Sequence, residues 1–507
     1  MNSAPKWRIF AALAVGFFAA WFTAAQDEPA KRDAPVKFDV HWDKVVRVSQ
    51  TSATLQVVVN PPLRRGTPLH DNAFQALRNL GADYVRYVPW LPYPKLGVAE
   101  LEPPRDGKTS WDFSLIDPMT IDFLEATKGH SVILNFSTIP EWMYKTDKPV
   151  AYPADANQVS WDYEQGAELR DASMKEVAEY YARLYSWYTQ GGFTDELGKR
   201  HESGYHYAIP YWEVLNEVDY EHSMTPETYT RLYDEIVTAM KAVDPNLRFV
   251  GMALASEDNP KFFEYFLDHK NHKPGVPLDF ISYHFYATPT SDQSLGVEQF
   301  TYFNQAEGFL KSVRYIEAIR KRLSPETKTT IDEIGVIDAD DQSQGGPGHV
   351  TQPIPPAYWN LAGAMYAYVF GELATMGIEV AGESQLVGYP TQFPSVSMVD
   401  WNDGKPNPRF RVLQLLHDSF GPGDKIAASE DLPSNLYSLA FSTRSGKRRV
   451  LIINKRDRAA SISIAGASGG EMRFVDRSTG FGPPVTTKLA ADELKLDGLS
   501  VSVVTLP

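Results

Sequence analysis

The sequence predicts an α/β fold in which a (β/α)8 barrel is followed by a C-terminal β-sandwich. Three observations lead to this prediction. Apolar, β-rich segments alternate with amphipathic segments of helical period up to about residue 423. There are eight of these β-rich segments, which is the number that a closed barrel requires. Past Asp424 the helical periodicity stops and only short β-rich runs remain.

The eight β-rich segments are the strand candidates of the barrel. Each is rich in β-branched and aromatic residues and is bounded by turn residues, as expected of strands. They begin near Ser52, Asp83, Ser131, Tyr211, Arg248, Asp279, Lys328 and Ile378. Their alternation with helices predicts parallel strands, with all the carboxyl ends at one mouth of the barrel.

Helical segments lie between the strand candidates. Their apolar residues recur at intervals of three and four, which places them on one face of a helix. The helix that follows Thr225 has a clear start, because a threonine side chain can cap the first amides and Pro226 suits the first turn. The clearest helical segments are residues 71–81, 173–192, 225–245 and 305–325.

The chain divides into a barrel and a smaller β domain. Residues 51–423 form the predicted barrel, and the short β-rich runs of residues 424–507 predict a β-sandwich. We expect residues 26–50 to form a polar linker and a strand that joins the sandwich. One low-complexity stretch, residues 343–356, follows the seventh strand and is a candidate rim or lid of the barrel mouth.

The first 25 residues have the pattern of a secretory signal peptide. Lys6 and Arg8 precede an apolar run from Ile9 to Phe22, and small residues follow up to Ala25. This run is shorter than the roughly 20 apolar residues that span a bilayer, although an uncleaved anchoring helix is the alternative. We expect an exported protein, periplasmic or extracellular, with no stable membrane partner once the signal is cleaved. Because the chain has no cysteine, disulfides and thiolate metal sites are excluded.

The net charge of −15 argues against some classes of binding partner but does not identify one. An acidic protein repels polyanions, and the sequence has no basic stretch interleaved with aromatic residues, so nucleic acid is not an expected partner. A neutral carbohydrate would suit an acidic surface. The same acidity could serve only solubility.

Two of the predicted strands run into glutamates, Glu217 after the fourth strand and Glu333 after the seventh. Because these strands lie across the barrel from each other, their carboxyl groups can face one sugar. Glycoside cleavage needs one protonated and one ionised carboxyl group, and a separation of roughly 5 Å predicts retention of configuration. Taken singly, each glutamate could equally be a solvated residue at a strand end.

The segments YWEVLNE and IDEIG resemble the catalytic pair of the clan A retaining glycoside hydrolases. Within this clan the sequence is most similar to family 39, which includes β-xylosidases and α-L-iduronidases. Two further segments, STIPEWM and WNDGKPNPRFRVLQLL, also resemble family 39 sequences. The resemblance covers the barrel and the trailing sandwich. It implies that Glu217 is the acid/base and Glu333 the nucleophile. Asn216, which precedes the acid/base, could donate a hydrogen bond from its side-chain amide to the 2-hydroxyl of the sugar. Alternatively, it could only cap the turn.

Other residues of the barrel mouth are candidate substrate contacts. His284 and Tyr286 point to the same side of the sixth strand. The tyrosine could donate to Glu333, and the histidine could contact Glu217 or a sugar hydroxyl, unless it is a satisfied core histidine. Arg86, which ends the second strand, could hold the nucleophile in its ionised form or belong to a structural ion pair.

Further candidates bear on the choice of sugar. Trp142 could be a sugar platform, because an indole face covers a pyranose well, or a core residue; Glu141 could be a substrate contact or a loop anchor. The chain departs from family 39 usage at Val88, Val218 and Glu383. Glu383 is a candidate polar contact where an aromatic wall is often found. The sugar is therefore left open.

We expect a retaining glycoside hydrolase that cleaves a β-xyloside-like or related glycan by double displacement. We expect no metal or organic cofactor, because the sequence has neither an HExxH motif nor a Gly-rich phosphate loop. Two alternatives would use the same residues. One is a carbohydrate-binding barrel without catalysis, and the other is a transglycosylase.

Overall fold

The computed structural model describes residues 35–146, 152–160, 168–289, 293–342, 354–390 and 392–507. The predicted signal peptide, most of the predicted linker and residues 343–353 of the predicted rim lie outside these residues. Within the described ranges, no helix combines the length and the apolar character needed to cross a membrane.

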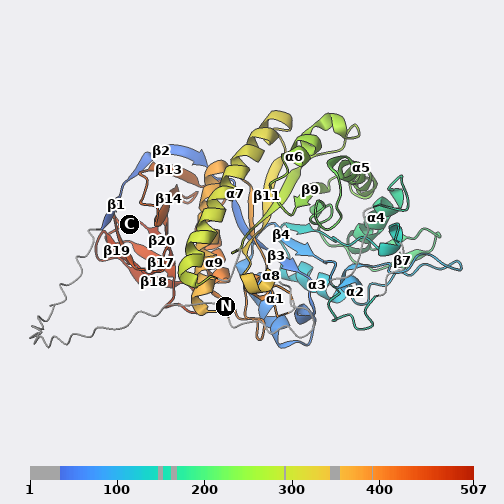
Figure 1. The fold of residues 1–507 in the computed structure, drawn as a ribbon, viewed down its shortest axis with the longest axis horizontal. Coiled ribbons are helices and arrows are strands. Elements are labelled where there is room, and N and C mark those ends of the chain that lie inside the picture. The colour runs from blue at the N-terminus through green and yellow to red at the C-terminus, as the bar shows by residue number, and fades with distance from the viewer. Residues whose placement is uncertain (1–34, 147–151, 161–167, 290–292, 343–353, 391) are drawn as a thin grey trace, which may run out of the picture. The chain divides into compact units, whose positions relative to one another are not determined.

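A closed barrel of parallel strands forms the centre of the fold, as the sequence predicts (Figure 1). Each strand corresponds to one of the eight predicted segments. Their apolar side chains are almost wholly buried, which is expected of strands covered on the outside by helices. In chain order the strands are β3 (Ser52–Val58), β4 (Val85–Val88), β5 (Val132–Leu134), β8 (Tyr211–Glu213), β9 (Arg248–Leu254), β10 (Phe280–Ala287), β11 (Lys328–Val336) and β12 (Val380–Glu383).

Helices follow the strands around the outside of the barrel. The four predicted segments correspond to α1 (Pro68–Leu80), α4 (Lys175–Thr189), α5 (Pro226–Val243) and α7 (Leu295–Leu323). Thr225 caps α5 as predicted, since its hydroxyl accepts the amide of Thr228. The other helices are α2 (Pro94–Gly97), α3 (Asp117–Ala126), α6 (Pro260–Leu267), α8 (Ala339–Gln342), α9 (Pro356–Met376) and α10 (Pro408–Ser419), with 3₁₀ turns η1 (Pro61–Leu63), η2 (Glu141–Met143), η3 (His269–Asn271) and η4 (Pro394–Val396).

The C-terminal strands form two antiparallel-rich sheets that enclose a second core. Residues 36–48, inside the segment where the sequence places a returning strand, contribute one strand to each sheet. The larger sheet has the order β18-β17-β20-β15-β14-β13-β2, and the smaller sheet has the order β1-β16-β19. The bounds are β1 (Val36–Phe38), β2 (Val40–Val48), β13 (Lys425–Ser429), β14 (Leu436–Ser442), β15 (Arg448–Asn454), β16 (Ala460–Ile464), β17 (Glu471–Val475), β18 (Val485–Lys488), β19 (Glu493–Leu496) and β20 (Val501–Thr505); a separate hairpin joins β6 (Gly192–Thr194) to β7 (Arg200–Glu202).

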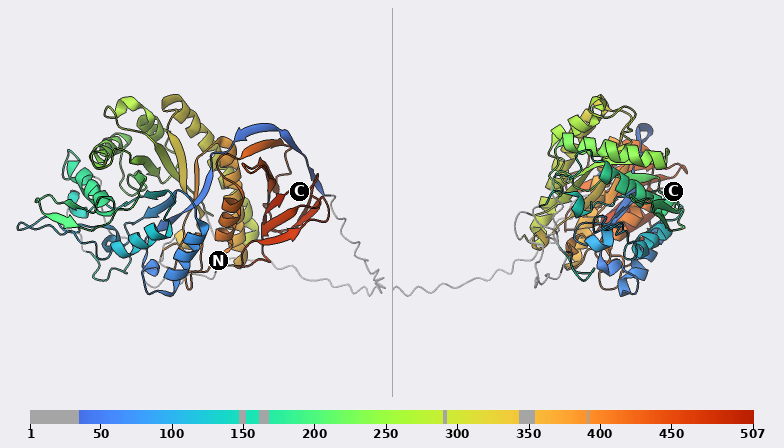
Figure 2. Two further views of the ribbon diagram at one scale, coloured as in Figure 1. Left: turned by 180° about the vertical axis from the view of Figure 1, so that it is seen from behind. Right: turned by 90° about the vertical axis from the view of Figure 1, so that its right-hand side faces the viewer.

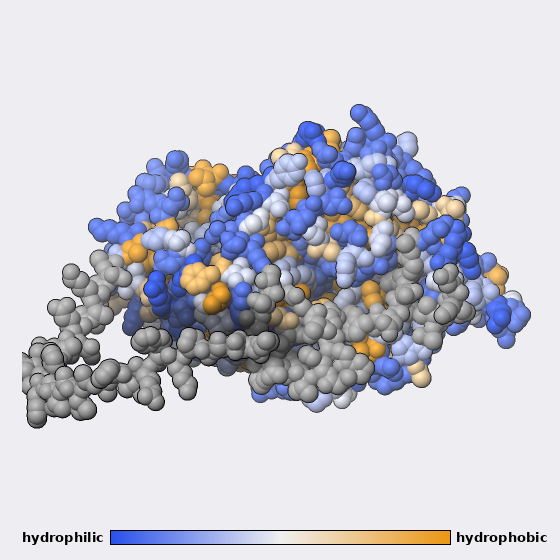
Figure 3. Space-filling view, viewed as in Figure 1, coloured by the Kyte–Doolittle hydropathy of each residue, from blue (hydrophilic) through white to orange (hydrophobic). Residues whose placement is uncertain are grey.

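Helix α9 lies between the barrel strands and the sandwich (Figure 2). On its sandwich side, Tyr437 of β14 packs so closely on Gly371 that a Cβ atom there would lie 2.6 Å from the tyrosine oxygen. The barrel core continues into the sandwich through Phe441, Leu451 and Val501. The face drawn in Figure 3 is mainly hydrophilic, with scattered apolar side chains.

Candidate active site

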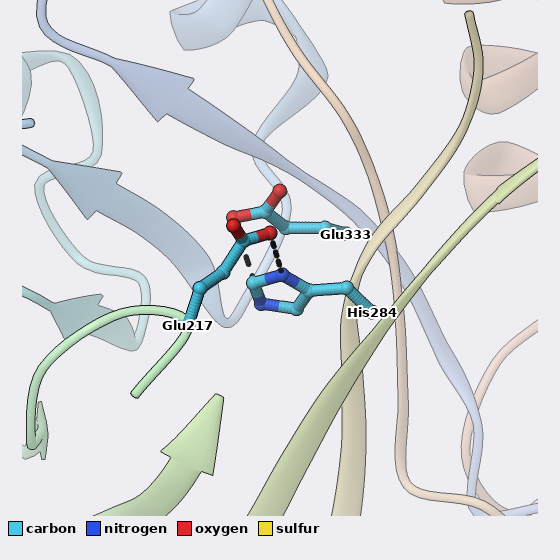
Figure 4. A group of neighbouring side chains, drawn as sticks. All are labelled: Glu217, His284 and Glu333. Carbon is cyan, nitrogen blue, oxygen red and sulfur yellow. Dashed lines mark hydrogen bonds and ion pairs between the residues drawn. The ribbon is translucent and has the colours of Figure 1, made fainter. Parts of the chain in front are cut away.

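Glu217 and Glu333 point toward each other across His284 (Figure 4). One carboxylate oxygen of each glutamate and one ring nitrogen of His284 all lie within 4.8 Å of one another. Retaining glycosidases hold their two carboxyl groups about 5 to 5.5 Å apart, whereas inverting enzymes need about 6.5 to 9.5 Å. The short separation leaves no room for a water molecule between the sugar and the second carboxylate.

The backbone positions of the two glutamates differ from the prediction that both end a strand. β8 ends at Glu213, so Glu217 lies in the loop beyond it, whereas β11 continues past Glu333. The loop turns sharply, because Leu215 and Glu217 have positive φ angles of 64° and 42°. The Glu217 amide donates to the carbonyl of Ala253 at 2.7 Å, which ties the loop to the end of β9.

His284 is fully buried and bridges the two glutamates. A register shift after Ser282 pairs His284 with Glu333 across β10 and β11. Its Nδ1 lies 3.0 Å from Glu217 Oε1, and its Nε2 lies 3.6 Å from Glu333 Oε1. Burial lowers the pKa of His284, but the charge of Glu333 and the bond to Glu217 outweigh it and raise this pKa to about 9. The ring is therefore an imidazolium at neutral pH, with Nδ1 donating to Glu217.

Arg86 holds Glu333 from inside the barrel. Its Nη1 donates to Glu333 Oε1 at 2.5 Å and to Gln56 at 2.7 Å, its Nη2 donates to Asn216 Oδ1 at 2.6 Å, and its Nε donates to Glu213 at 2.5 Å. The side chain is 1% exposed. Arg86 thus has the predicted role toward Glu333. Its role as a direct substrate contact stays a prediction.

The environment of Glu333 favours its ionised form. Burial raises the pKa of this carboxyl group, but the charges of His284 and Arg86 and the hydroxyl of Tyr286 together lower it below its ordinary value. The Tyr286 hydroxyl donates to Glu333 Oε2 at 2.5 Å, as the sequence predicts, and lies 2.5 Å from the Ser384 hydroxyl. Glu333 is therefore an aligned carboxylate, which is the form a nucleophile requires.

A second layer of carboxyl groups lies beneath the pair. Glu213 accepts hydrogen bonds from Arg86, Asn135 and Ser282 at 2.5–2.7 Å. Burial raises the pKa of Glu213, but Arg86 and these donors lower it below its ordinary value. Burial and the charge of Glu213 raise the pKa of Asp332 well above its ordinary value, which keeps Asp332 uncharged. Arg86 thus faces the carboxylates of Glu213 and Glu333 inside the barrel, and Asp332 adds no charge beside them.

The sequence interpretation missed Glu213 as a functional residue. The available signal was a charged residue inside the otherwise apolar segment YWEVL, where strand alternation directs it into the barrel. Gln56, in the apolar segment of β3, offered the same signal.

Asn216 lies next to Glu217, with its amide held at both ends. Its Oδ1 accepts from Arg86 at 2.6 Å, and its Nδ2 donates to Glu221 Oε1 at 2.9 Å. Trp90 donates to the same oxygen of Glu221 at 2.5 Å. The orientation of the Asn216 amide is therefore determined, and among the described residues the second hydrogen on its Nδ2 has no hydrogen-bond partner. Glu221 and Trp90 are two further site residues that the sequence interpretation missed.

The prediction that Glu383 contacts substrate is wrong. Glu383 is 0% exposed and pairs with Arg409 of α10 at 2.9 Å. Burial raises the pKa of Glu383 to about 7, against the lowering effect of Arg409. The physical reason is that β12 ends at Glu383 with this side chain turned toward α10. The next residue, Ser384, is the one that contacts Tyr286.

Trp142 and Glu141 lie in the turn η2 beyond β5. The Trp142 indole N–H donates to the carbonyl of Glu100 at 2.9 Å, and the guanidinium of Arg170 lies 5.0 Å from the ring centroid. These contacts occupy the N–H and one face of the indole. The role of Trp142 as a sugar platform stays a prediction. Glu141 is buried, with 4% of its surface exposed.

Glu217, His284 and Glu333 are also grouped closely enough to hold a metal ion. Their chemistry does not favour one. A metal ligand must be a neutral imidazole, whereas the charge of Glu333 and the hydrogen bond to Glu217 outweigh burial and favour the protonated ring of His284. Arg86 already occupies one oxygen of Glu333 with a positive charge. The arrangement instead suits proton transfer and nucleophilic attack by the two glutamates.

Comparison with protein families matches residues 30–333 to Glycosyl hydrolases family 39. The chain belongs to glycoside hydrolase family 39. This confirms the resemblance drawn from YWEVLNE and IDEIG. The matched segment contains both glutamates of the pair, and more than half of the 507 residues. The last barrel strand and most of the sandwich lie beyond it.

One curated relative of this family 39 chain is a beta-xylosidase from Caldicellulosiruptor saccharolyticus. It is 29% identical over 209 residues, which are 41% of this chain and 37% of the relative. The match therefore spans well under half of the relative's length.

Solved structures share the fold of this family 39 chain over nearly its whole length. A GH51 arabinofuranosidase from Xanthomonas axonopodis pv. citri has a TM-score of 0.64 at 12% identity, covering 93% of this chain and 100% of that one. An alpha-L-arabinofuranosidase from Thermotoga maritima has a TM-score of 0.62 at 14% identity, covering 93% and 99%. At these identities the likeness concerns the fold, and it confirms the barrel with a trailing sandwich.

Proposed function

We propose that this family 39 chain is a retaining glycoside hydrolase in which Glu333 is the nucleophile and Glu217 is the acid/base. The observation that carries the proposal is the close approach of the two carboxyl groups, within 4.8 Å, with only one of them held by Arg86 and Tyr286. A nucleophile has to be ionised and fixed, whereas an acid/base has to exchange protons with solvent. Glu217, with 19% of its side chain exposed, is the more open of the two.

The first step forms a glycosyl–enzyme ester. One oxygen of Glu333 attacks the anomeric carbon while Glu217 gives its proton to the departing oxygen, so the glycosidic bond breaks as the ester bond forms. Arg86 and Tyr286 keep Glu333 aligned for this attack. The second amide hydrogen of Asn216 is available to a sugar hydroxyl next to the reacting carbon, where a hydrogen bond strengthens in the transition state.

The second step releases the sugar. Glu217, now a carboxylate, takes a proton from a water molecule. As it does so, the oxygen of that water attacks the anomeric carbon from the face that the leaving group occupied. Glu333 leaves as a carboxylate, and the positive charges of His284 and Arg86 stabilise it as it re-forms. Two inversions at one carbon retain its configuration.

A β-xyloside-like glycan is the substrate to test first. Family membership and the beta-xylosidase relative support this class. The departures at Val88 and Val218 leave related glycosides within the proposal. Carbohydrate is the proposed partner on the same grounds.

The test is hydrolysis of an aryl glycoside panel that includes 4-nitrophenyl β-D-xyloside, with the product anomer followed by NMR. Glu217→Gln should reduce kcat/KM about 10² to 10⁴-fold, with a smaller loss on a dinitrophenyl leaving group that needs no proton. Glu333→Gln should abolish turnover on every leaving group. Glu264→Gln, a carboxylate-to-amide change on the exposed side of α6, is the matched control and should behave as wild type.

The outcomes separate the proposal from its alternatives. Full activity in both variants would overturn the catalytic assignment. Glycan binding without hydrolysis in the wild type would indicate a carbohydrate-binding barrel. Transfer products that dominate over hydrolysis at high acceptor concentration would indicate a transglycosylase with the same pair.

We also propose that the protein is exported and that cleavage occurs near Ala25. The support is the order of Lys6 and Arg8, an apolar run and small residues. N-terminal sequencing of the protein recovered outside the cytoplasm tests this, and an intact Met1 would overturn the cleavage.

A further inference from the structure

Glu221 is a third carboxyl group at the site, one turn of chain beyond Glu217. The Glu217 carbonyl accepts the amides of both Tyr220 and Glu221, at 2.8 and 2.7 Å, so the backbone of this turn is fixed. The Glu221 side chain then reaches back to the loop residue Asn216 and across to Trp90, which follows β4.

The two oxygens of Glu221 have different environments. Oε1 accepts two hydrogen bonds, from Trp90 Nε1 at 2.5 Å and from Asn216 Nδ2 at 2.9 Å. Oε2 is buried, and no donor lies within bonding distance of it in the described part of the chain. A buried carboxylate oxygen without a donor leaves its charge unsolvated, whereas the same oxygen carrying a proton leaves no charge to solvate.

The charges around Glu221 also favour its protonated form. Glu217 and Glu333 both repel a negative charge at this position. The nearby cations are committed elsewhere, since Arg86 binds Glu213 and Glu333, and His284 binds Glu217. Burial first, and then the charge of Glu217, raise the pKa of Glu221 well above its ordinary value.

We propose that Glu221 is a positioning residue that works as an uncharged carboxylic acid, whose Oε1 fixes the Asn216 amide so that its remaining N–H faces the sugar. Arg86 holds the carbonyl end of that amide, and Glu221 holds its nitrogen end. Without Glu221 the amide could rotate about its last bond, and its N–H would no longer be directed. Because Glu221 is neutral, it does so without placing a further negative charge beside the pair.

This inference rests on the proposed function for its kinetic test, which compares two substitutions. Glu221→Leu removes both acceptor bonds and should lower kcat/KM on 4-nitrophenyl β-D-xyloside at least about tenfold, mainly through kcat, as expected for a hydrogen bond made in the transition state. On the 2-deoxy analogue the loss should be much smaller, because that substrate lacks the hydroxyl that Asn216 binds. Glu221→Gln, uncharged and still an acceptor at Oε1, should recover most of the loss without moving either limb of the pH profile.

Other outcomes would overturn the proposal. If Glu221→Gln fails as severely as Glu221→Leu, or moves the alkaline limb, an ionised carboxylate is required. If Glu221→Leu lowers kcat/KM equally on both substrates, the role of Glu221 is structural rather than directed at the sugar hydroxyl.

A spectroscopic measurement tests the charge state without turnover. The infrared difference between wild type and Glu221→Gln at neutral pH should contain the C=O stretch of a protonated carboxyl group. A carboxylate band in its place would overturn the proposal. Because this readout needs no substrate, a wild type that is inactive on all glycosides would count against the proposed function and not against the state of Glu221.

Discussion

The guanidinium of Arg86 donates to Glu333 across 2.5 Å, although 247 residues separate the two in the chain. The same guanidinium binds Glu213 at the end of β8 and Asn216 in the loop that carries Glu217. One buried side chain therefore sets the position of the nucleophile and of the segment that holds the acid/base.

Arg86→Met should destabilise the fold as well as inactivate the site. It leaves Glu213 and Glu333 buried without their cation, and breaking a buried ion pair costs about 3–5 kcal/mol. Denaturant unfolding measures the change. Arg322→Met, which breaks an exposed pair with Glu264, is the control and should cost less than about 1 kcal/mol. Equal effects of the two substitutions would contradict the central role of Arg86.

His284→Gln should move the acidic limb of kcat/KM to higher pH. The imidazolium is the strongest influence lowering the pKa of Glu333, so its loss lets burial raise that pKa, and the nucleophile protonates earlier as pH falls. The pH dependence of aryl xyloside hydrolysis measures this. His130→Gln, a change at a partly exposed histidine outside the site, should leave the limb in place. A limb that stays fixed or moves downward in His284→Gln would refute the electrostatic role.

Substitutions of Glu383 distinguish a structural ion pair from a substrate contact. Glu383→Leu leaves the Arg409 guanidinium buried and unpaired at that end, and should cost about 3–5 kcal/mol of stability. Glu383→Gln keeps an acceptor for Arg409 and should leave KM within about twofold of wild type, a change of under 1 kcal/mol. A large rise in KM for a well-folded Glu383→Gln protein would restore this residue to the substrate site.

Stability should fall with rising pH through Glu100. Burial and then the neighbouring Glu196 raise the pKa of Glu100 to about 9. Because the folded pKa exceeds the unfolded value, the protonated group stabilises the fold fully below about pH 4.5, and this contribution declines up to about pH 9, by at most about 1.4 kcal/mol per pH unit. Thermal unfolding between pH 5 and 9 should be less pH-dependent in Glu100→Gln than in Glu264→Gln. An unchanged slope would contradict a protonated Glu100.

Sequence patterns located the barrel and both members of the pair because those features depend on local chemistry. Strand alternation, helical spacing and a glutamate at the close of an apolar run are all properties of neighbouring residues. They placed Tyr286 and Glu333 on barrel strands, whereas Glu217 lies in the loop beyond β8. The same reasoning predicted a substrate contact for Glu383 and missed its ion pair, because only the packing of α10 against β12 brings Arg409 to it.

The amino-acid sequence by itself determined the order of strands and helices, the family, and the two glutamates on which the proposed reaction depends. The tertiary structure alone decided which charges meet inside the barrel: Arg86 with Glu213 and Glu333, His284 between the pair, and Glu221 against Asn216. The physical reason is that protonation depends on burial and on charges a few ångströms away, and these are contributed by strands far apart in the chain.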